Sequence, residues 1–302
     1  MPDPASRGVE PDIGADLLAL IRARPERLIS LTEISTLSSP ARRRTAFRLE
    51  FAGGLTLKGR RLESPERAQR VERILGLAGD GFPRTIDRRG DALLLQWIQG
   101  RALASLDPVP PAALERCGRI LGALHQLATP ELPDVRIPAP EDLLAKLRRD
   151  TGLLADAGEL DSGLGRTAVE TAAALAPRRA SSGVIHKDFC AENIVLDDSG
   201  SPVSIDNAAL SVGPHDLDLA RTWYRWEMNP RDRSHFLRGY ERHRGSVTFV
   251  EHFAFWAICV LAGSASIRLR ARLGGHREPL IRLRRLLEFL ETDAVDHPLW
   301  VV

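Results

Sequence analysis

Cysteine is scarce in this sequence: three residues, Cys117, Cys190 and Cys259, are spread widely over 302 positions. An odd number without short spacings forms neither a disulfide framework nor the paired-cysteine knuckle of a structural zinc site. The amino-terminal stretch also lacks the basic start and apolar run of a secretory signal. We therefore expect a cytoplasmic protein that works under reducing conditions.

Long hydrophobic runs and an excess of one charge are also missing. The longest uncharged run, residues 253–267, is shorter than the roughly 20 residues that cross a bilayer, so it predicts a buried helix. The 42 basic and 40 acidic residues leave a formal net charge of +2, which gives no general attraction to nucleic acid or to a membrane surface. We expect neither as a partner, and the oligomeric state stays open.

The first hundred residues carry patterns typical of an antiparallel sheet. Segments 28–34, 45–51 and 55–62 predict three strands, and residues 82–98 predict a further hairpin around Gly90. Between them, residues 64–78 predict one helix, with Ser64 as its N-cap and Pro65 in its first turn. Residues 1–18 resemble a frayed end.

Beyond Gly100 the apolar spacing becomes helical and stays so for most of the remaining chain. The exceptions are "VIHKDFC" and "NIVLDDSGSPVSID", which predict a loop followed by two short strands. With 43% hydrophobic residues, the chain is long enough for a large core or two lobes. We expect an α+β protein with an amino-terminal lobe of residues 1–97 and a mostly helical carboxy-terminal lobe of residues 98–302.

One loop concentrates the chemistry. His186, Asp188 and Asn193 follow the pattern H-x-D-x-x-x-x-N, and Asp206 follows on the next strand. Asp188 is suited to orient and deprotonate a hydroxyl, while Asn193 and Asp206 offer the oxygen ligands that magnesium prefers. Phosphoryl transfer needs little more than an acceptor held in line, metal ions and positive charge on the donor.

In the order of these segments the sequence resembles the aminoglycoside phosphotransferase and choline kinase group. "LLLQWIQGRAL" is similar to the hinge strand of that family, "LGALHQL" to the first large helix of its second lobe, and "HKDFCAEN" to its catalytic loop. "IDNAALSVGPHDLDLA" is similar to its metal-binding segment. The resemblance implies the two-lobed protein-kinase-like fold, ATP as donor, magnesium as cofactor, and a small-molecule hydroxyl as acceptor.

The resemblance also assigns roles to residues that bind the nucleotide. Lys58 matches the lysine that contacts the donor phosphates, and Glu72 matches its ion-pair partner. Glu66 is the alternative, but six residues apart on a helix the two glutamates cannot both point at one lysine. Gln96 and Ile98 match the backbone contacts to adenine, which leave no side-chain signature, so the choice between ATP and GTP stays open.

Other residues of the motif match structural positions. Asp218 corresponds to an aspartate that supports the catalytic loop from below, and we expect His186 to pack and hydrogen-bond the loop rather than act as the base. His125, Cys190 and the aromatic residues Trp223 and Trp226 are more typical of a core than of a ligand site.

The sequence departs from the family in three places. The segment between the first two strands, "STLSSPARRRTAF", has no glycine to cover the phosphates. Backbone amides near Ser38 and Ser39 or the arginines at 42–44 are candidates for that contact, and a solvated basic turn is the alternative. Position 187 is lysine where the family usually has glycine, and "DNA" at 206–208 replaces the commoner acidic and aromatic trio.

Three functions compete on these observations. The one we favour is an ATP-dependent, magnesium-assisted kinase of a small hydroxylated molecule, with Asp188 as base. A pseudokinase that binds nucleotide without turnover is the alternative that the missing glycines suggest. A metal-dependent hydrolase built on His186, Asp188, Asp206 and Asp216 is the third, and it lacks the histidine pairs typical of zinc hydrolases.

Overall fold

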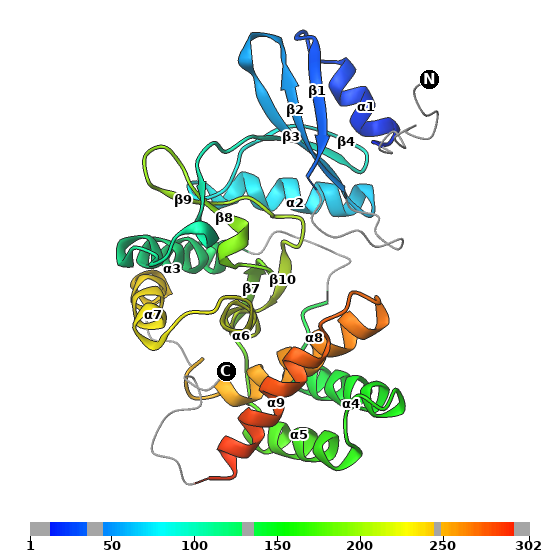
Figure 1. Cartoon of the computed structure of the whole chain (residues 1–302), viewed down its shortest axis with the longest axis vertical. Helices are drawn as coiled ribbons and strands as arrows, with labels where there is room; N and C mark the ends of the chain where they lie inside the picture. Colours follow the sequence, from blue (N-terminus) through cyan, green and yellow to red (C-terminus); the bar gives the residue numbers. More distant parts are fainter. Residues whose placement is uncertain (1–12, 35–44, 129–135, 245–248, 293–302) are drawn as a thin grey trace, which may run out of the picture. The chain divides into compact units, whose positions relative to one another are not determined.

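The computed structural model describes residues 13–34, 45–128, 136–244 and 249–292 (Figure 1). The chain forms two compact units, one of Met1–Gly76 with Pro83–Trp97 and one of Leu77–Phe82 with Ile98–Val302. The glycine-free segment with Ser38, Ser39 and the arginines at 42–44 lies outside the described residues.

The first unit is built on a five-stranded antiparallel sheet in the order β1-β2-β3-β5-β4. Its strands are β1 (Leu28–Glu33), β2 (Thr45–Phe51), β3 (Thr56–Arg61), β4 (Thr85–Arg89) and β5 (Ala92–Gln96). The apolar side chains that alternate along β2, β3 and β5 lie on one face and form the core of this unit. The strands expected from the sequence and the hairpin around Gly90 are confirmed.

Two helices accompany this sheet, and one of them was not expected. The predicted helix is present as α2 (Pro65–Ala78), where the Ser64 hydroxyl accepts a hydrogen bond from the backbone N–H of Arg67 at 3.3 Å. The expectation of a frayed amino-terminal stretch and a single helix is wrong, because α1 (Ala15–Arg22) packs its apolar side on the sheet core. Leu17 is fully buried there.

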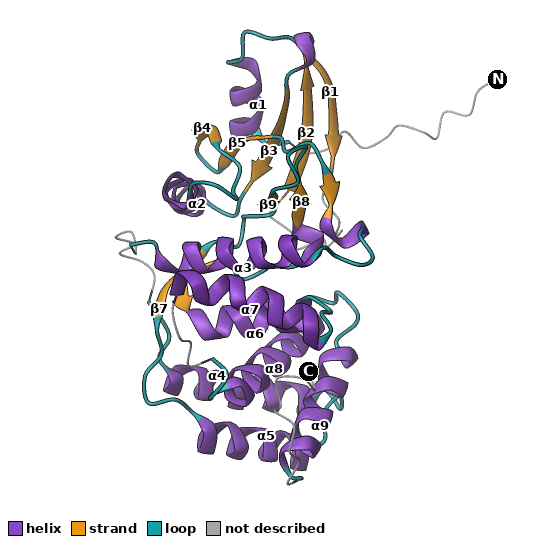
Figure 2. Ribbon diagram, turned by 90° about the vertical axis from the view of Figure 1, so that its left-hand side faces the viewer, coloured by secondary structure: helices purple, strands orange, loops and turns teal. Residues whose placement is uncertain are grey.

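The second unit is mainly helical (Figure 2). Its helices are α3 (Pro111–Gln126), α4 (Pro140–Asp156), α5 (Ser162–Leu175), α6 (His215–Arg225), α7 (Pro230–Arg244), α8 (Phe253–Arg270) and α9 (Arg277–Leu290). Helices α3 and α7 approach so closely that a Cβ atom on Gly118 would lie 2.0 Å from the carbonyl oxygen of Phe236. Glycine at this position is what allows the two backbones to meet.

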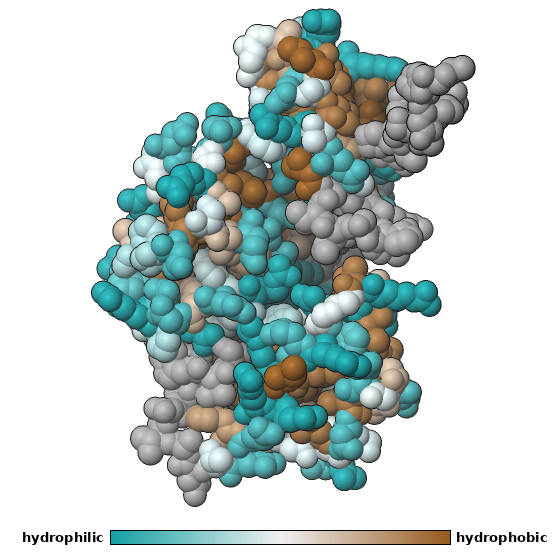
Figure 3. Space-filling view, in the orientation of Figure 1, coloured by the Kyte–Doolittle hydropathy of each residue, from teal (hydrophilic) through white to brown (hydrophobic). Residues whose placement is uncertain are grey.

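Helix α8 is the long apolar segment of the sequence. It has the length and composition of a membrane span, but 67% of the apolar window is buried inside the molecule. Phe255 and Trp256 are fully buried in it. On the face drawn in Figure 3 the surface of this unit is mostly hydrophilic, with hydrophobic areas that are small and separate. The prediction of a buried core helix is confirmed.

Short strands position the loop that holds the motif. β7 (Ser182–Ile185) pairs with β10 (Ser211–Pro214), and β6 (Arg101–Ala102) pairs with β8 (Ile194–Leu196), which pairs with β9 (Pro202–Ser204). Residues 186–193 therefore connect the end of one small sheet to the start of another. Both ends of the loop are fixed by backbone hydrogen bonds, so its side chains have defined positions.

Candidate active site

His186 begins the loop and is completely buried. Its Nδ1 accepts a hydrogen bond from the backbone N–H of Asp188 at 3.3 Å, and its Nε2 lies 2.8 Å from Ser204 Oγ and 3.0 Å from Asn207 Oδ1. Because Nδ1 accepts, Nε2 carries the proton and donates. Both ring nitrogens are thus engaged within the protein, so the structural role expected for His186 is confirmed and the hydrolase alternative loses its histidine ligand.

Asp188 and Asn193 face each other across the loop. The Asn193 Nδ2 donates to the Asp188 carboxylate Oδ2 at 3.0 Å and to the Asp188 backbone oxygen at 2.9 Å. The amide thereby closes the turn, and the Asp188 side chain stays 35% exposed. This arrangement leaves the amide oxygen of Asn193 and the second carboxylate oxygen of Asp188, Oδ1, directed away from their mutual contact.

Asp206 follows strand β9 on the segment next to the loop. The backbone N–H of Ile205 donates to the carbonyl of Asn193 at 2.8 Å, so Asp206 directly follows a residue hydrogen-bonded to Asn193. On its other side, Asn207 is buried and bonds both His186 and the Ser204 carbonyl. The half-buried Asp206 carboxylate is therefore carried by backbone that is fixed on both sides.

Asp218 supports the loop from helix α6. Its Oδ2 accepts from the backbone N–H of His186 at 2.7 Å, and its Oδ1 accepts from that of Lys187 at 2.6 Å. Burial alone would raise the pKa of this carboxyl group, but hydrogen bonding to His125 and the backbone lowers it to about 2. Asp218 is ionised and structural, as expected from the sequence.

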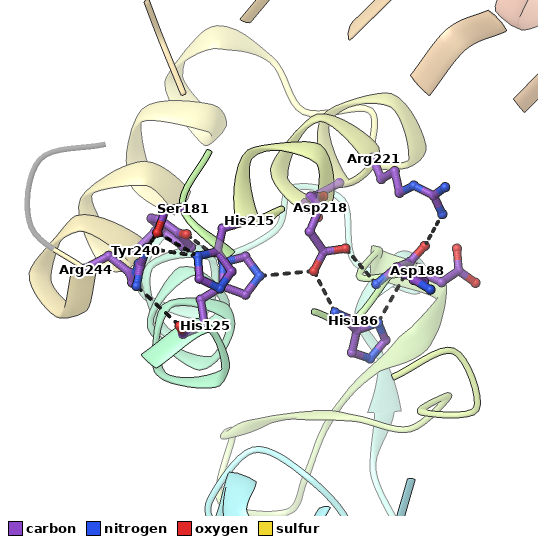
Figure 4. Close-up of polar contacts among 11 residues, drawn as sticks. His125, Ser181, His186, Asp188, His215, Asp218, Arg221, Tyr240 and Arg244 are labelled. Carbon is purple, nitrogen blue, oxygen red and sulfur yellow. Dashed lines mark hydrogen bonds and ion pairs between the residues drawn. The ribbon is translucent and has the colours of Figure 1, made fainter. Parts of the chain in front are cut away.

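A buried polar network extends from Asp218 into helices α3 and α7 (Figure 4). His125 Nε2 lies 3.1 Å from Asp218 Oδ2, and His125 Nδ1 lies 2.6 Å from the Tyr240 hydroxyl. The carboxylate can only accept, so His125 donates through Nε2 and the Tyr240 hydroxyl donates to Nδ1. Burial lowers the pKa of His125, which keeps the ring neutral, in line with its expected place in the core.

His215 extends the same network by stacking on His125, with ring centroids 4.4 Å apart. Its Nδ1 accepts a hydrogen bond from Arg244 Nη2 at 3.0 Å, and the Ser181 hydroxyl lies 3.2 Å from the same nitrogen. Burial, together with the nearby His125 and Arg244, lowers the pKa of His215 to about 3. The ring is therefore neutral when the protein is folded.

Lys187 adopts the left-handed conformation, with φ of 69°. A side chain with a Cβ atom is strained there, whereas glycine is not. Asp218 holds the Lys187 N–H, and Arg221 Nη1 donates to the Lys187 carbonyl at 3.4 Å. These bonds explain how the loop keeps its shape with lysine at a position where the resembling family has glycine.

A second arginine of α6 approaches the Asp188 carboxylate itself. Arg225 Nη2 lies 3.6 Å from Asp188 Oδ1 and 3.7 Å from the sulfur of Cys190. Burial is the largest single effect and acts to lower the pKa of Arg225, but Asp188, Cys190 and Glu192 together outweigh it and the pKa is raised. Sequence reasoning missed Arg225, although its place seven residues after Asp218, two helical turns on, is a usable signal.

Cys190 is a buried free thiol. Burial, followed by the nearby Asp188 carboxylate, raises its pKa far above the ordinary range for cysteine. A thiol that stays protonated is a poor nucleophile. The interpretation of Cys190 as core filler is confirmed, as are those of Trp223 and Trp226, which are 0% and 4% exposed.

The residues expected to bind nucleotide lie in or next to the first unit. Lys58 is buried in β3, opposite Leu95 of β5. The Glu72 carboxylate forms an ion pair with Arg88 Nε of β4 at 2.5 Å. The pairing of Lys58 with Glu72 stays a prediction. Glu66, the other candidate, is exposed.

The two hinge residues fall on either side of the boundary between the units, Gln96 in the first and Ile98 in the second. The backbone N–H of Gln96 donates to the Arg84 carbonyl at 2.9 Å. This N–H is therefore engaged within the sheet and is not available to a nucleotide base. Contacts to adenine would fall to other backbone groups of this segment.

The fold and the loop are those of a kinase-like phosphotransferase. The model of the phosphotransferase enzyme family matches residues 33–251, so the chain belongs to that family. A search of curated protein sequences finds no match. The expected family, the kinase-like fold class and the assignment as a small-molecule phosphotransferase are confirmed.

Solved structures with the same fold come from several members of this class. Macrolide 2'-phosphotransferase MphH from Brachybacterium faecium is 15% identical with a TM-score of 0.63, over 88% of this chain and 96% of that one. A putative aminoglycoside phosphotransferase from Ralstonia eutropha JMP134 is 15% identical with a TM-score of 0.66, over 90% and 94%. A choline/ethanolamine kinase family protein from Mesorhizobium loti is 16% identical with a TM-score of 0.64, over 94% and 96%. At such identities the likeness establishes the fold.

Proposed function

We propose that this protein transfers the γ-phosphate of ATP to a hydroxyl group of a small molecule, with Asp188 as the base. The observation that carries this proposal is the division of polar atoms between Asp188 and Asn193. One carboxylate oxygen of Asp188 is held by the Asn193 amide, which fixes the direction of the other. An acceptor hydroxyl bonded to Oδ1 is oriented for attack, and its proton passes to the carboxylate.

Magnesium is the cofactor that the residues fit. Asn193 uses its amide N–H₂ group inside the loop, which leaves an oxygen for the metal, and Asp206 supplies a carboxylate from the adjoining segment. Across the described ranges no three His, Cys, Asp or Glu residues cluster as a metal cage. Such a two-residue site suits magnesium, which takes its other ligands from phosphates and water. When bound, the ion neutralises the phosphate charges of the donor.

Nucleotide binding is assigned to the first unit and the hinge. We assign Lys58 to the donor phosphates, and backbone groups at Gln96 and Ile98 to the base, with ATP favoured over GTP only by resemblance. Backbone contacts at a hinge leave no side-chain preference that separates the two nucleotides. A competition assay with both at equal concentration decides between them.

The acceptor class is bounded by charge. Solved structures with this fold are named as a macrolide phosphotransferase, an aminoglycoside phosphotransferase and a choline/ethanolamine kinase family protein. Residues 101–302 carry a net charge of −2, too small for a site built to hold a polycation. Sugars, amino alcohols, nucleoside antibiotics and macrolides are the acceptors to test.

The test combines a binding screen with turnover. Magnesium and ATP should raise the melting temperature, since a ligand at 100 times its Kd adds about 2.7 kcal/mol of stability. Candidate acceptors are then screened for phosphate transfer with wild type and Asp188→Asn. Asp188→Asn should keep the shift with nucleotide and lose turnover by orders of magnitude. Full turnover in Asp188→Asn contradicts the proposal, and a shift without turnover for any acceptor or water favours the pseudokinase.

The metal role is tested separately with Asp206→Ala. Removing this carboxylate should abolish the part of the ATP affinity that depends on magnesium, because one of the two protein oxygens that hold the ion is lost. Isothermal titration with and without magnesium measures the difference. Equal affinity of the variant and wild type for Mg–ATP would show that Asp206 is not a ligand.

A further inference from the structure

Helix α6 contacts the catalytic loop at three points along one face. Asp218 binds the backbone at His186 and Lys187, Arg221 binds the Lys187 carbonyl, and Arg225 reaches the Asp188 carboxylate. The first two contacts are to backbone and explain the shape of the loop. The third is of another kind, because it places a positive charge beside the reacting side chain.

The position of Arg225 relative to Asp188 indicates what that charge does. Asn193 occupies Oδ2 of Asp188, and Arg225 approaches the other oxygen, Oδ1, at 3.6 Å. This separation is longer than a direct hydrogen bond, so Oδ1 keeps room for an acceptor hydroxyl. An acceptor hydroxyl that is hydrogen-bonded to Oδ1 would lie beside the guanidinium. The phosphorus atom to which the acceptor oxygen becomes bonded would then lie beside it as well.

The guanidinium also has donors to spare. Arg225 contacts both Asp188 and Cys190 through Nη2, and within the part of the chain that the structure describes its Nε and Nη1 form no hydrogen bond or ion pair. The side chains of Arg225 and Asp188 are each 35% exposed, so a ligand can reach them. Cys190, two residues after Asp188, is buried and stays protonated, so it brings no negative charge of its own to the guanidinium that lies 3.6 Å from Oδ1.

We propose that Arg225 is a catalytic residue that binds the phosphoryl group during its transfer, an inference that rests on the proposed function. As the bond between the γ-phosphorus and the bridging oxygen breaks, its electron pair leaves on ADP. A new bond forms from the acceptor oxygen to phosphorus, and the hydroxyl proton passes to Asp188. Negative charge spreads over the equatorial oxygens, where a guanidinium fixed in advance stabilises it.

The experiment compares Arg225→Ala, Arg225→Lys and the control Arg238→Ala. Arg238 is likewise a partly exposed arginine of the same unit, but it contacts Glu115 and His235 rather than the loop. Turnover is measured with the acceptor found in the screen, and as magnesium-dependent ATP hydrolysis where water is the acceptor. Affinity is measured for Mg–ADP alone and for Mg–ADP with aluminium fluoride, a mimic of the phosphoryl group in flight.

Arg225→Ala should lower kcat about 100-fold, as loss of one fixed donor to a transition state does. Its Kd for Mg–ADP should stay within about threefold of wild type, while the extra affinity given by aluminium fluoride is lost. Arg225→Lys should recover part of kcat and part of the extra affinity given by aluminium fluoride, because lysine keeps the positive charge but lacks the several N–H donors of the guanidinium. Arg238→Ala should match wild type in every assay.

Two results overturn the inference. If Arg225→Ala keeps the extra affinity for aluminium fluoride, the arginine does not meet the phosphoryl group. If both Arg225 variants lose affinity equally for Mg–ADP alone and for Mg–ADP with aluminium fluoride, and also have a lower melting temperature, the residue only supports the loop. Asp188→Asn separates this failure from that of the proposed function. If Asp188→Asn loses turnover while Arg225→Ala keeps the turnover of wild type, the inference about Arg225 is refuted and the proposed function stands.

Discussion

The Asp218 carboxylate accepts a hydrogen bond from the backbone N–H of Lys187 at 2.6 Å, although Lys187 lies in the left-handed region with φ of 69°. The hydrogen bond to Asp218 offsets the strain of the left-handed conformation at Lys187. A left-handed non-glycine residue costs about 1–2 kcal/mol, and a charge-assisted bond to a buried carboxylate is among the stronger interactions that can offset it. The loop before Asp188 is therefore held in place against its own conformational preference.

This relationship predicts different stabilities for two substitutions at position 187. Lys187→Gly and Lys187→Ala both remove the side chain, but only alanine keeps the strained Cβ. Glycine relieves the strain of about 1–2 kcal/mol but loses more backbone entropy on folding, which costs about 0.5–1 kcal/mol. Lys187→Gly should therefore be more stable than Lys187→Ala by up to about 1.5 kcal/mol. Urea unfolding of both variants measures the difference. An alanine variant more stable than the glycine variant would show that the left-handed conformation is not strained.

Asp218→Asn tests the support itself. Asparagine has one acceptor oxygen where aspartate has two, so at least one buried donor among His125 and the backbone N–H groups of His186 and Lys187 loses its partner. Leaving a buried donor without its acceptor in this way costs about 1–3 kcal/mol. We expect the free energy of unfolding to fall by about that amount, and turnover to fall with it because the loop carries Asp188.

The control for this variant is Asp142→Asn. Asp142 also accepts from a backbone N–H, that of Ala139 at 2.9 Å, but its side chain is 36% exposed and water replaces the bond. Its loss should cost no more than about 1 kcal/mol. Chemical denaturation followed by far-ultraviolet circular dichroism compares the two, and equal small losses would mean that Asp218 is not a structural anchor.

Much of this site could be predicted from the sequence because the motif is local. His186, Asp188 and Asn193 lie within one loop, and alternating apolar residues indicated the strands around it. Helix α1 was missed because it has only 8 residues and its N-cap, Gly14, makes no side-chain hydrogen bond. A helix so short is stabilised by packing on the sheet rather than by its own sequence.

Contacts between distant elements were beyond sequence reasoning. The partner of Glu72 depends on how β4 lies beside α2, and Arg88 is 16 residues away in sequence. The His125 and Tyr240 pair joins α3 to α7 across 115 residues. Spacing along one helix can show which residues share a face, as with Asp218 and Arg225, but not which neighbour that face meets.

The buried histidines predict a loss of stability in mild acid. The pKa of His215 is lowered from 6.5 to about 3 by burial first of all, and that of His125 is lowered for the same reason. Between those values the unfolded chain binds protons that the folded protein does not, so the free energy of unfolding falls as pH falls. The slope from His215 alone is at most about 1.4 kcal/mol per pH unit.

Replacing His215 with asparagine should flatten this dependence between pH 6 and pH 4, whatever it does to stability at pH 7. His243→Asn is the matched control, since His243 is an exposed histidine on α7. Thermal unfolding at several pH values gives the slopes. An unchanged slope in His215→Asn would mean that its ring is protonated in the folded protein.

The pairing of α3 with α7 predicts that two helical glycines respond in opposite ways to alanine. At Gly118 of α3 a Cβ atom would lie 2.0 Å from the Phe236 carbonyl oxygen and 2.8 Å from the Tyr240 backbone nitrogen. Backbone atoms cannot yield as a flexible side chain does, so the helices must separate. Gly118→Ala should destabilise the protein by about 1–3 kcal/mol.

Gly152 of α4 is the matched comparison, because a Cβ atom there meets nothing within 4 Å. Gly152→Ala should stabilise the protein by about 0.5–1 kcal/mol, the difference in helix propensity. Gly118→Ala should also lower turnover, since moving α7 away from α3 pulls Tyr240 from His125 and loosens the His125 bond to Asp218. Denaturation curves and turnover of both variants check this, and a Gly118→Ala protein as stable and active as wild type would refute the close contact.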